Sequence, residues 1–415
     1  MHEARATSAN LADPGLWARP DRLDVLDRLL LDAPLSWSAE PVTEWFPEGG
    51  RGFWSLVRYE DVVTASKDQE TFSSAHGTEI VDMEPAMQHI FGGMLNMSGD
   101  EHARHRAIVN RVLTPRSVLA LSDAIRAHAR RCILRVVERG SADFMVDIVG
   151  DFPAQIICEL LDVPVDDRPR LIELANAALA RYGTAESYAA VLEIIDYALG
   201  LVADVRRRGV RAEGGFLDRL IGAEVDGEAL TDHEIGVFFA LLATAGIETT
   251  TTTIGQGMRA LSLHPEVRKE WQEDYDGLVG RVTEEMIRWT SPVMHFRRTA
   301  TRDVVLHGQT IKAGDKVVLW YVAANRDRSR FPDPDRLDIH RENSAHVGFG
   351  GGGPHFCLGA VLARKEIEIF FRELFELLPD IEVDGEPEHL HSNFVNGLVR
   401  LPVRFTPRRP AGEAQ

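Results

Sequence analysis

Cysteine is scarce in this sequence, with three residues in a chain of 415. So few thiols exclude a disulfide framework or a zinc site built from several cysteines, and they fit a reducing compartment. Positive charge is also short, because 46 Lys and Arg residues face 64 Asp and Glu residues and leave a net charge of -18. A chain this acidic is not suited to non-specific binding of nucleic acid.

Long hydrophobic runs and linker segments are missing as well. No apolar run reaches the roughly 18 to 20 residues of a membrane span, and Glu3 and Asp13 do not fit a signal peptide or an anchor. We therefore expect a cytoplasmic protein without a membrane anchor. No repeat, low-complexity block or Pro/Ser/Gly linker divides the chain. We expect one domain over residues 1–415, loose only at about 1–12 and 408–415.

One glycine-dense loop, residues 348–359, carries a single cysteine, Cys357, to the start of a helical run over residues 360–374. Glycine lets the backbone approach a large flat ligand closely. A cysteine just before a helix lies near amide N–H groups and the positive end of the helix dipole, which favours the thiolate over the thiol. Two interpretations follow: an axial thiolate ligand of haem iron, or a free buried cysteine beside a structural turn.

The loop resembles the haem-binding signature of the cytochrome P-450 family, and the similarity extends over nearly the whole chain. The resemblance implies a single-domain cytochrome P-450 fold, mainly α with smaller β-sheets, in which haem b lies between a long central helix and the cysteine loop. Cys357 would be the axial ligand of the iron, with Phe349 and Gly359 beside the haem. Phe349 stands eight residues before Cys357 instead of the family's usual seven. This expansion is similar to a bacterial branch that hydroxylates methyl-branched lipids and sterol side chains.

A capping box formed by Thr231 and Glu234 marks the start of the long helix. The apolar run continues to about Leu263, which makes a helix roughly 50 Å long. Its middle, residues 245–250, contains a glycine, an acid and threonines. Glycine costs about 1 kcal/mol against alanine in a helix, and threonine hydroxyls compete for backbone carbonyls. Such a conflict in a well-formed element often marks a functional site, and a kinked structural helix is the other interpretation.

The family resemblance assigns roles to four residues in this middle section. Thr249 would hydrogen-bond dioxygen, and Glu248 would belong to a proton relay. Ala245 and Gly246 would leave room over the face of the haem.

Basic residues are predicted to hold the two haem propionates. His102 and Arg106 stand four residues apart, so on a helix they share one face. Buried carboxylates need cationic or hydrogen-bonding partners. The resemblance places this pair on a propionate and adds Arg298 and His355, whereas the alternative is a solvated basic helix face. The other basic residues of 100–111 form a positive patch that could dock an acidic electron donor.

Three further charged residues are expected to brace the cysteine loop. Glu285 and Arg288 stand at i and i+3, a spacing that is common on helix surfaces. The resemblance joins this pair to Arg336 in a buried network with a structural role, because charges that are buried together must satisfy one another.

Candidate substrate contacts come from segments that the resemblance places around a pocket: the weakly periodic segment 71–96, the extended segment after Pro292, and a hairpin tip near residue 394. His295 is unusual in such a place, and it could hydrogen-bond a polar group of the substrate or turn into the protein. The candidates are Ile80, Met83, Met94, Val293, His295, Phe394 and Val395.

Together these features predict a haem-thiolate monooxygenase. It would activate dioxygen and hydroxylate a C–H bond of a lipophilic small molecule, such as a branched lipid, terpenoid or steroid. The chain shows no flavin or nicotinamide domain, so the two electrons would come from a separate ferredoxin and its NAD(P)H-dependent ferredoxin reductase. Two alternatives stay open: oxidative coupling or ring formation in natural-product biosynthesis, and a non-catalytic haem-binding gas sensor.

Overall fold

The computed structural model describes residues 10–42, 48–82, 88, 93–180, 184–211, 213–342 and 344–408. Met83, one of the predicted pocket residues, lies outside them, as do most of the two terminal segments that we expected to be loose. The N-terminal segment was set too long, because Leu11 and Ala12 are buried in a hydrophobic cluster that also contains Trp17.

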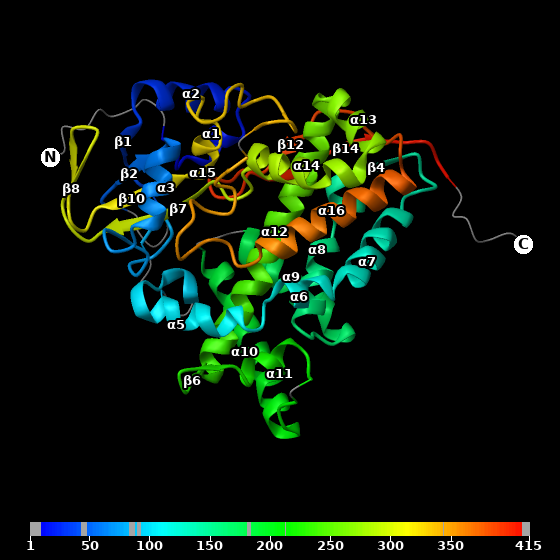
Figure 1. The fold of residues 1–415 in the computed structure, drawn as a ribbon, viewed down its shortest axis with the longest axis horizontal. Helices are drawn as coiled ribbons and strands as arrows, with labels where there is room; N and C mark the ends of the chain where they lie inside the picture. The colour runs from blue at the N-terminus through cyan, green and yellow to red at the C-terminus, as the bar shows by residue number, and fades with distance from the viewer. Residues whose placement is uncertain are drawn as a thin grey trace, which may run out of the picture.

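The long helix α12 (Asp232–Leu263) has the predicted bounds and runs through the middle of the molecule (Figure 1). Its capping box is formed, because the Glu234 N–H donates to Thr231 Oγ1 at 3.2 Å and the Thr231 N–H donates to Glu234 Oε2 at 2.7 Å. The helices packed against it include α8 (Phe152–Leu160), α10 (Ala185–Arg208), α14 (Tyr275–Thr290) and α16 (Ala360–Leu377).

The remaining helical elements extend this core or cover the sheet. They are α1 (Pro14–Trp17), α2 (Arg22–Asp32), α3 (Tyr59–Lys67), α5 (Gly99–Asn110), α6 (Pro115–Leu119), α7 (Ser122–Leu134), α9 (Arg168–Ala180), α11 (Phe216–Ile221), α13 (Pro265–Glu273) and α15 (Tyr321–Ala324), with the short turns η1 (Gly93–Asn96), η2 (Phe144–Val149) and η3 (Val165–Asp167).

Among the described residues, α12 is the one helix long and apolar enough to cross a membrane by length and composition. Our expectation that no segment reaches this limit was therefore wrong. However, 56% of its most apolar window is buried within the protein. This degree of burial is typical of a core helix, which avoids water by packing against its neighbours.

The largest sheet of the described chain has five strands in the order β1-β2-β10-β7-β3. In it β10 pairs parallel to β2 and antiparallel to β7, where Trp320 is opposite His295. A second sheet has three strands in the order β11-β14-β4. Three further sheets have two strands each: β12 with β13, β5 with β6, and β8 with β9. The strands are β1 (Leu35–Ser38), β2 (Phe53–Leu56), β3 (Phe72–Ser73), β4 (Ser141–Asp143), β5 (Glu224–Val225), β6 (Glu228–Ala229), β7 (His295–Ala300), β8 (Val304–Leu306), β9 (Gln309–Ile311), β10 (Lys316–Trp320), β11 (Glu382–Val383), β12 (Glu388–His389), β13 (Leu398–Arg400) and β14 (Pro402–Arg404).

Figure 1 shows the five-stranded sheet with α1, α2 and α3 on one side of the molecule and most of the long helices on the other. The prediction of a mainly α fold with smaller β-sheets is confirmed. The cysteine loop joins the two sides, because it leads into α16 and packs against the end of α3.

Candidate active site: the cysteine loop and the open face of the central helix

Cys357 lies immediately before α16, with its backbone held by the loop. Its N–H donates to the carbonyl of Phe349 at 3.0 Å. The side chain is accessible to water, yet enough protein surrounds it that desolvation raises the pKa of the thiol, against the N–H of Gly359 and the charge of Arg106, which lower it. We had expected the helix start to favour the thiolate, but in the protein alone it does not outweigh desolvation. A bound metal ion would supply the missing stabilisation of the thiolate.

Two glycines of the cysteine loop have a packing role. A Cβ at Gly351 would lie 2.3 Å from Ser66 Oγ in α3, and a Cβ at Gly353 would lie 2.6 Å from the Ser66 carbonyl oxygen. Gly353 also has a φ of +75°, which side chains disfavour. The glycines thus let the loop lie directly on α3. Phe349 stays beside the cysteine and stacks under Arg364, whose Cζ is 4.4 Å from the ring centroid.

The middle of α12 exposes one face although most of the helix is buried. Ala245 is exposed and Thr249, one turn further on, is half-buried. The Thr249 hydroxyl donates to the Ala245 carbonyl at 2.8 Å, as a threonine inside a helix commonly does. Gly246 serves a different purpose from the one we predicted, because a Cβ there would lie 2.4 Å from Ile157 of α8. Its missing side chain lets two helices approach, and Ala245 carries the open face.

Glu248 is an acid at the edge of this face. Burial raises the pKa of its carboxyl to about 7, and the hydrogen bond from Thr252, which lowers it, only partly offsets the burial. The Thr252 hydroxyl donates to Glu248 Oε1 at 3.5 Å. A carboxyl with a pKa near neutrality can both hold and release a proton at physiological pH. Its chemistry therefore suits the predicted proton relay.

The four basic residues predicted for the propionates form one cluster. The rings of His102 and His355 are 4.1 Å apart between centroids. Burial, together with the neighbouring charges, that of Arg106 first, lowers the pKa of His102 to about 4. Burial likewise lowers the pKa of His355 to about 2, helped by Arg298. Both imidazoles are therefore neutral at physiological pH, and the positive charge of the cluster comes from half-buried Arg106 and buried Arg298.

This cluster has no internal counter-charge. Within the described residues, no carboxylate forms an ion pair with any of its four members, and His355 Nε2 is buried without a hydrogen-bond partner. Buried cations and unpaired polar atoms are costly unless a ligand satisfies them. A flat group with two carboxylates and a metal that binds sulfur fits the cluster, Cys357 and the open face of α12 together. The residues present therefore fit haem.

Comparisons with known proteins agree with this chemistry. The family model described as cytochrome P450, here written P-450, matches residues 184–404. The chain is 39% identical over 418 residues to the methyl-branched lipid omega-hydroxylase of Mycobacterium tuberculosis, which covers 97% of this chain and 96% of the relative. It is 35% identical to the steroid C26-monooxygenase of Rhodococcus jostii, covering 95% of this chain and 84% of the relative.

Among solved structures, the fold matches a Mycobacterium marinum cytochrome P-450 in complex with pseudoionone. The TM-score is 0.88 at 34% identity, and the match covers 97% of this chain and 100% of the other. The chain belongs to the cytochrome P-450 family. It is a haem-binding monooxygenase with lipid and steroid hydroxylases among its relatives, which sets aside the alternative of a gas sensor without catalytic activity.

The network that braces the P-450 fold differs from the prediction in its third member. Arg288 Nε and Nη2 each donate to the Glu285 carboxylate at 2.8 Å. Arg336 is exposed and contributes only its carbonyl, which accepts from Arg288 Nη2 at 3.3 Å. The guanidinium that approaches Glu285 is that of Arg341, at 3.4 Å. Choosing Arg336 was therefore wrong, because the chain turns between 336 and 341 and only the later arginine points inward.

Asn325 connects this network to the cysteine loop. Its carbonyl accepts from Arg288 Nη1 at 2.8 Å, and its side-chain Oδ1 accepts from the Val347 N–H, also at 2.8 Å. Val347 directly precedes the glycine-dense segment. The buried charges thus hold the start of the loop, as their predicted structural role requires.

The predicted substrate contacts fall into separate groups. Ile80 is 4% exposed and packs in a core cluster with Met294 and Trp320, so assigning it to the pocket was wrong. Its carbonyl accepts from Lys316 Nζ at 3.0 Å, which holds the segment against β10.

The two C-terminal candidates, Phe394 and Val395, lie beside the segment after Pro292. Val293 and Val395 form a β-bridge, and the Met294 N–H donates to the Phe394 carbonyl at 2.8 Å. The tip of the hairpin is thus hydrogen-bonded to the segment that leads into β7. That these residues contact the substrate stays a prediction.

His295 is 2% exposed and lies between aromatic rings. Its ring centroid is 4.6 Å from that of Trp320 and 5.5 Å from that of Phe394. Burial lowers its pKa to about 3, so the imidazole is neutral, and neither nitrogen has a hydrogen-bond partner among the described residues. Its contact with Trp320 favours the interpretation that the ring turns into the protein.

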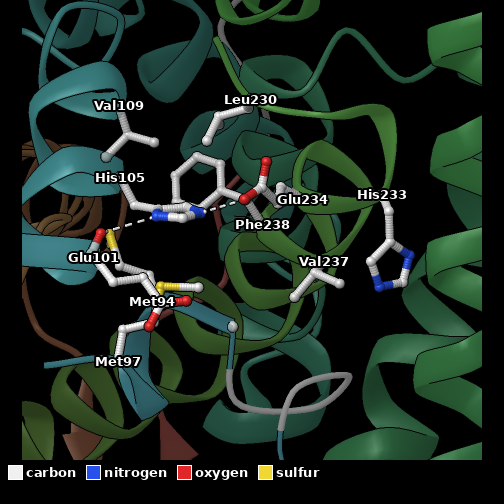
Figure 2. Close-up of a pocket in the computed structure, with 11 residues that line it drawn as sticks. Met94, Met97, Glu101, His105, Val109, Leu230, His233, Glu234, Val237 and Phe238 are labelled. Atoms are coloured by element: carbon white, nitrogen blue, oxygen red, sulfur yellow. Dashed lines mark hydrogen bonds and ion pairs between the residues drawn. The ribbon is translucent and has the colours of Figure 1, made fainter. Parts of the chain in front are cut away.

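Met94 lines a pocket of about 190 Å³ between η1, α5 and the first turns of α12 (Figure 2). Met97, Val237 and Phe238 make its other apolar walls. Figure 2 shows His105 at one side, where its two ring nitrogens lie 2.9 Å from the Glu101 carbonyl and from Glu234 Oε1. Phe238, the lining residue nearest the open face, precedes Ala245 by seven positions, so this pocket begins about 10 Å along α12 from that face.

Sequence reasoning missed one buried acid close to the centre of the P-450. Glu366 of α16 is fully buried, and its Oε2 accepts from the Thr250 hydroxyl at 3.1 Å. Burial raises the pKa of Glu366 to about 8, so it is protonated at neutral pH. No local signal singled it out, because α16 carries other charged residues such as Lys365 and Glu368 along the same stretch.

Proposed function

We propose that this P-450 hydroxylates an unactivated C–H bond of a lipophilic substrate that carries a methyl branch or a sterol-like side chain, using two electrons from a separate ferredoxin and its NAD(P)H-dependent reductase. The observation that carries the proposal is the open face of α12, where Ala245 is exposed in an otherwise buried helix with Thr249 and Glu248 beside it. The small side chain leaves space there for a substrate.

When bound, haem with a thiolate ligand supplies the activation of dioxygen and the oxidation of the C–H bond. The protein residues position and protonate. Cys357 would hold the metal from the loop, and the basic cluster would hold the propionates. Thr249 must give up its bond to the Ala245 carbonyl before its hydroxyl donates to oxygen on the open face. Glu248 exchanges protons at its carboxyl, because its pKa of about 7 lies close to neutral pH.

The substrate class rests on the relatives and on the apolar walls. The relatives are named for a methyl-branched lipid and for a steroid, and the solved structure holds pseudoionone. The pocket next to Met94 has methionine, valine, leucine and phenylalanine in its walls, together with two histidines and two glutamates at its polar side. Methionine-rich surfaces adapt to apolar ligands of varied shape. These features support a lipophilic substrate of extended shape.

The electron donor would approach the cysteine-loop side, but part of the predicted positive patch is not available to it. Arg104 lies 3.1 Å and His105 2.9 Å from Glu234 Oε1, so both are engaged within the protein. Arg111, at the end of α5, is exposed and without an ion pair among the described residues. It is the residue of this helix that suits an acidic partner.

The proposal is tested by titrating the holoenzyme with branched fatty acids, terpenoids and steroids and following the haem spin state. Ligands that shift the spectrum are then turned over with surrogate ferredoxin and reductase, and products are identified by mass spectrometry. We expect a hydroxylated product, and we expect Glu248→Gln to bind the same ligand but to lose about 100-fold in kcat, as general acid catalysts do. Absence of any spectral shift across the panel, or a coupled or cyclised product instead of an alcohol, would reject it.

A further inference from the structure

A second pocket, of about 200 Å³, lies away from the cysteine loop, where α1 and α2 meet the C-terminal part of α12 and the end of α14. Its walls include Trp17, Trp289 and three arginines, Arg22, Arg259 and Arg326. An arginine cluster is unexpected in a chain with a net charge of -18, because the electrostatic potential of such a protein is negative over most of its surface.

The charges of this pocket are not balanced within the described residues. Arg326 Nη1 lies 2.8 Å from Asp335 Oδ1, and Asp335 also lines the pocket. Arg22 and Arg259 form no ion pair with a described carboxylate. Arg22 instead meets His389, with Nη2 3.2 Å from Nε2. Three guanidinium groups against one carboxylate leave two positive charges without a partner.

Burial makes this imbalance costly. It lowers the pKa of Arg22 to about 10, and the charge of Arg259 adds to the effect. Burial also lowers the pKa of Arg259, and the charge of Glu386, which forms no ion pair with it, only partly offsets this effect. His389 supplies no negative charge, and burial lowers its own pKa to about 4, so it is neutral beside Arg22. Arg22 and Arg259 are half-buried, and cations withdrawn from water in this way are stabilised by an anion.

The arginines are also held in place. The Cζ atoms of Arg259 and Arg326 lie 5.7 Å and 5.8 Å from the ring centroid of Trp289, which orients both guanidinium groups. Gln256 lines the same pocket, and its Nε2 donates to the Asn396 carbonyl at 3.0 Å. That bond fixes the amide, and Gln256 Oε1 remains buried without a hydrogen-bond partner in the described chain.

We propose that this pocket binds a phosphate group. A hydrogen phosphate dianion matches the two unbalanced charges of Arg22 and Arg259, and guanidinium groups suit phosphate oxygens. Its remaining O–H is the donor that Gln256 Oε1 lacks. The inference is independent of the P-450 reaction, because none of the residues that carry it belongs to the cysteine loop or to the open face of α12.

The test is calorimetric titration of the holoenzyme with inorganic phosphate at pH 7.5, with ionic strength kept constant by sodium chloride. We expect saturable binding that weakens at least tenfold in Arg259→Gln and in Arg22→Gln. These residues lie on different helices, so a folding defect in one variant leaves the other informative, and the carbon-monoxide difference spectrum reports whether each variant is intact. The control is Arg207→Gln, whose side chain is 76% exposed on α10 and which should bind phosphate like the wild type.

A second arm uses glycerol phosphate as the probe, to distinguish free phosphate from the phosphate group of a larger molecule. Tighter binding of the ester than of inorganic phosphate assigns the site to a phosphorylated metabolite, and binding of inorganic phosphate alone assigns it to the free ion. The proposal is overturned if neither probe binds saturably above chloride, or if both arginine variants bind phosphate as tightly as the wild type.

Discussion

Two buried groups of charged residues lie near the cysteine loop, and they are balanced in opposite ways. In the first, Glu285 is held between Arg288 and Arg341, with the remaining donors of Arg288 on backbone carbonyls. In the second, the cluster that contains His102 and Arg298 has no carboxylate partner among the described residues.

The difference separates structural charge from functional charge. Buried charges that stabilise a fold must be paired by residues of the chain itself, because a ligand is not bound at all times while the protein is folded. Charges that wait for a ligand are left unsatisfied in the protein alone, and the free energy of binding includes their neutralisation. The arginine pocket beside Trp289 belongs to the second kind by the same criterion.

The largest effect is expected from breaking the balanced network. Glu285→Ala leaves Arg288 buried without a counter-charge, so the free energy of unfolding should fall by about 3–5 kcal/mol. Urea unfolding followed by circular dichroism measures it. Glu376→Ala is the control, because that side chain is 55% exposed and pairs at the surface, where removal should cost about 1 kcal/mol or less. Equal losses in the two variants would show that the network is not structural.

A smaller and pH-dependent effect is expected at Glu366, which is neither paired nor charged. Burial raises its pKa from 4.5 to about 8 in the folded protein. The unfolded chain therefore loses this proton first, and the wild type should lose stability relative to Glu366→Gln as the pH rises from about 4.5 to about 8. Above that range the difference should level off at a few kcal/mol, since one pKa unit corresponds to about 1.4 kcal/mol.

The measurement is the free energy of unfolding of both proteins in urea at several pH values between 4.5 and 8.5. Parallel curves for wild type and Glu366→Gln would mean that this carboxyl is ionised in the folded state and is compensated by a partner. That outcome would mean that Glu366 is a paired structural charge, as Glu285 is, and not a buried group without a counter-charge.

The smallest effect on folding is expected in the unbalanced cluster. Arg106→Met removes a cation that has no carboxylate partner in the described chain, so the unfolding free energy of the haem-free protein should change by about 0.5 kcal/mol or less. Haem transfer to apomyoglobin should nevertheless become about tenfold faster or more, because a charge-assisted hydrogen bond to a propionate is lost. Arg111→Met, an exposed arginine at the end of the same helix, should leave haem transfer unchanged. If Arg106→Met lost much of its unfolding free energy but released haem no faster, the distinction between structural and functional charge would be contradicted.

Local patterns in the sequence were sufficient for much of the site. Cys357 before a helix, His102 and Arg106 on one helical face, and the capping box of Thr231 depend on spacing along the chain alone, and the structure brings the first three together. The bounds of α12 follow from the same kind of information, because a cap and an apolar run are both local. Membership of the family and the haem chemistry could therefore be inferred before any contact was known.

Other assignments required contacts between distant segments. Arg341 rather than Arg336 reaches Glu285, because a turn of the chain decides which guanidinium points inward. Gly246 is small to admit Ile157, which is 89 residues earlier in the sequence.

The sequence by itself thus determined the long helix, because a cap and an apolar run are local. Through its resemblance to the family it also predicted the cysteine ligand and the basic residues for the haem. Only the tertiary structure decided which charges are balanced and which are left for a ligand. The balance of a buried charge depends on every segment packed around it, and no local pattern contains those neighbours.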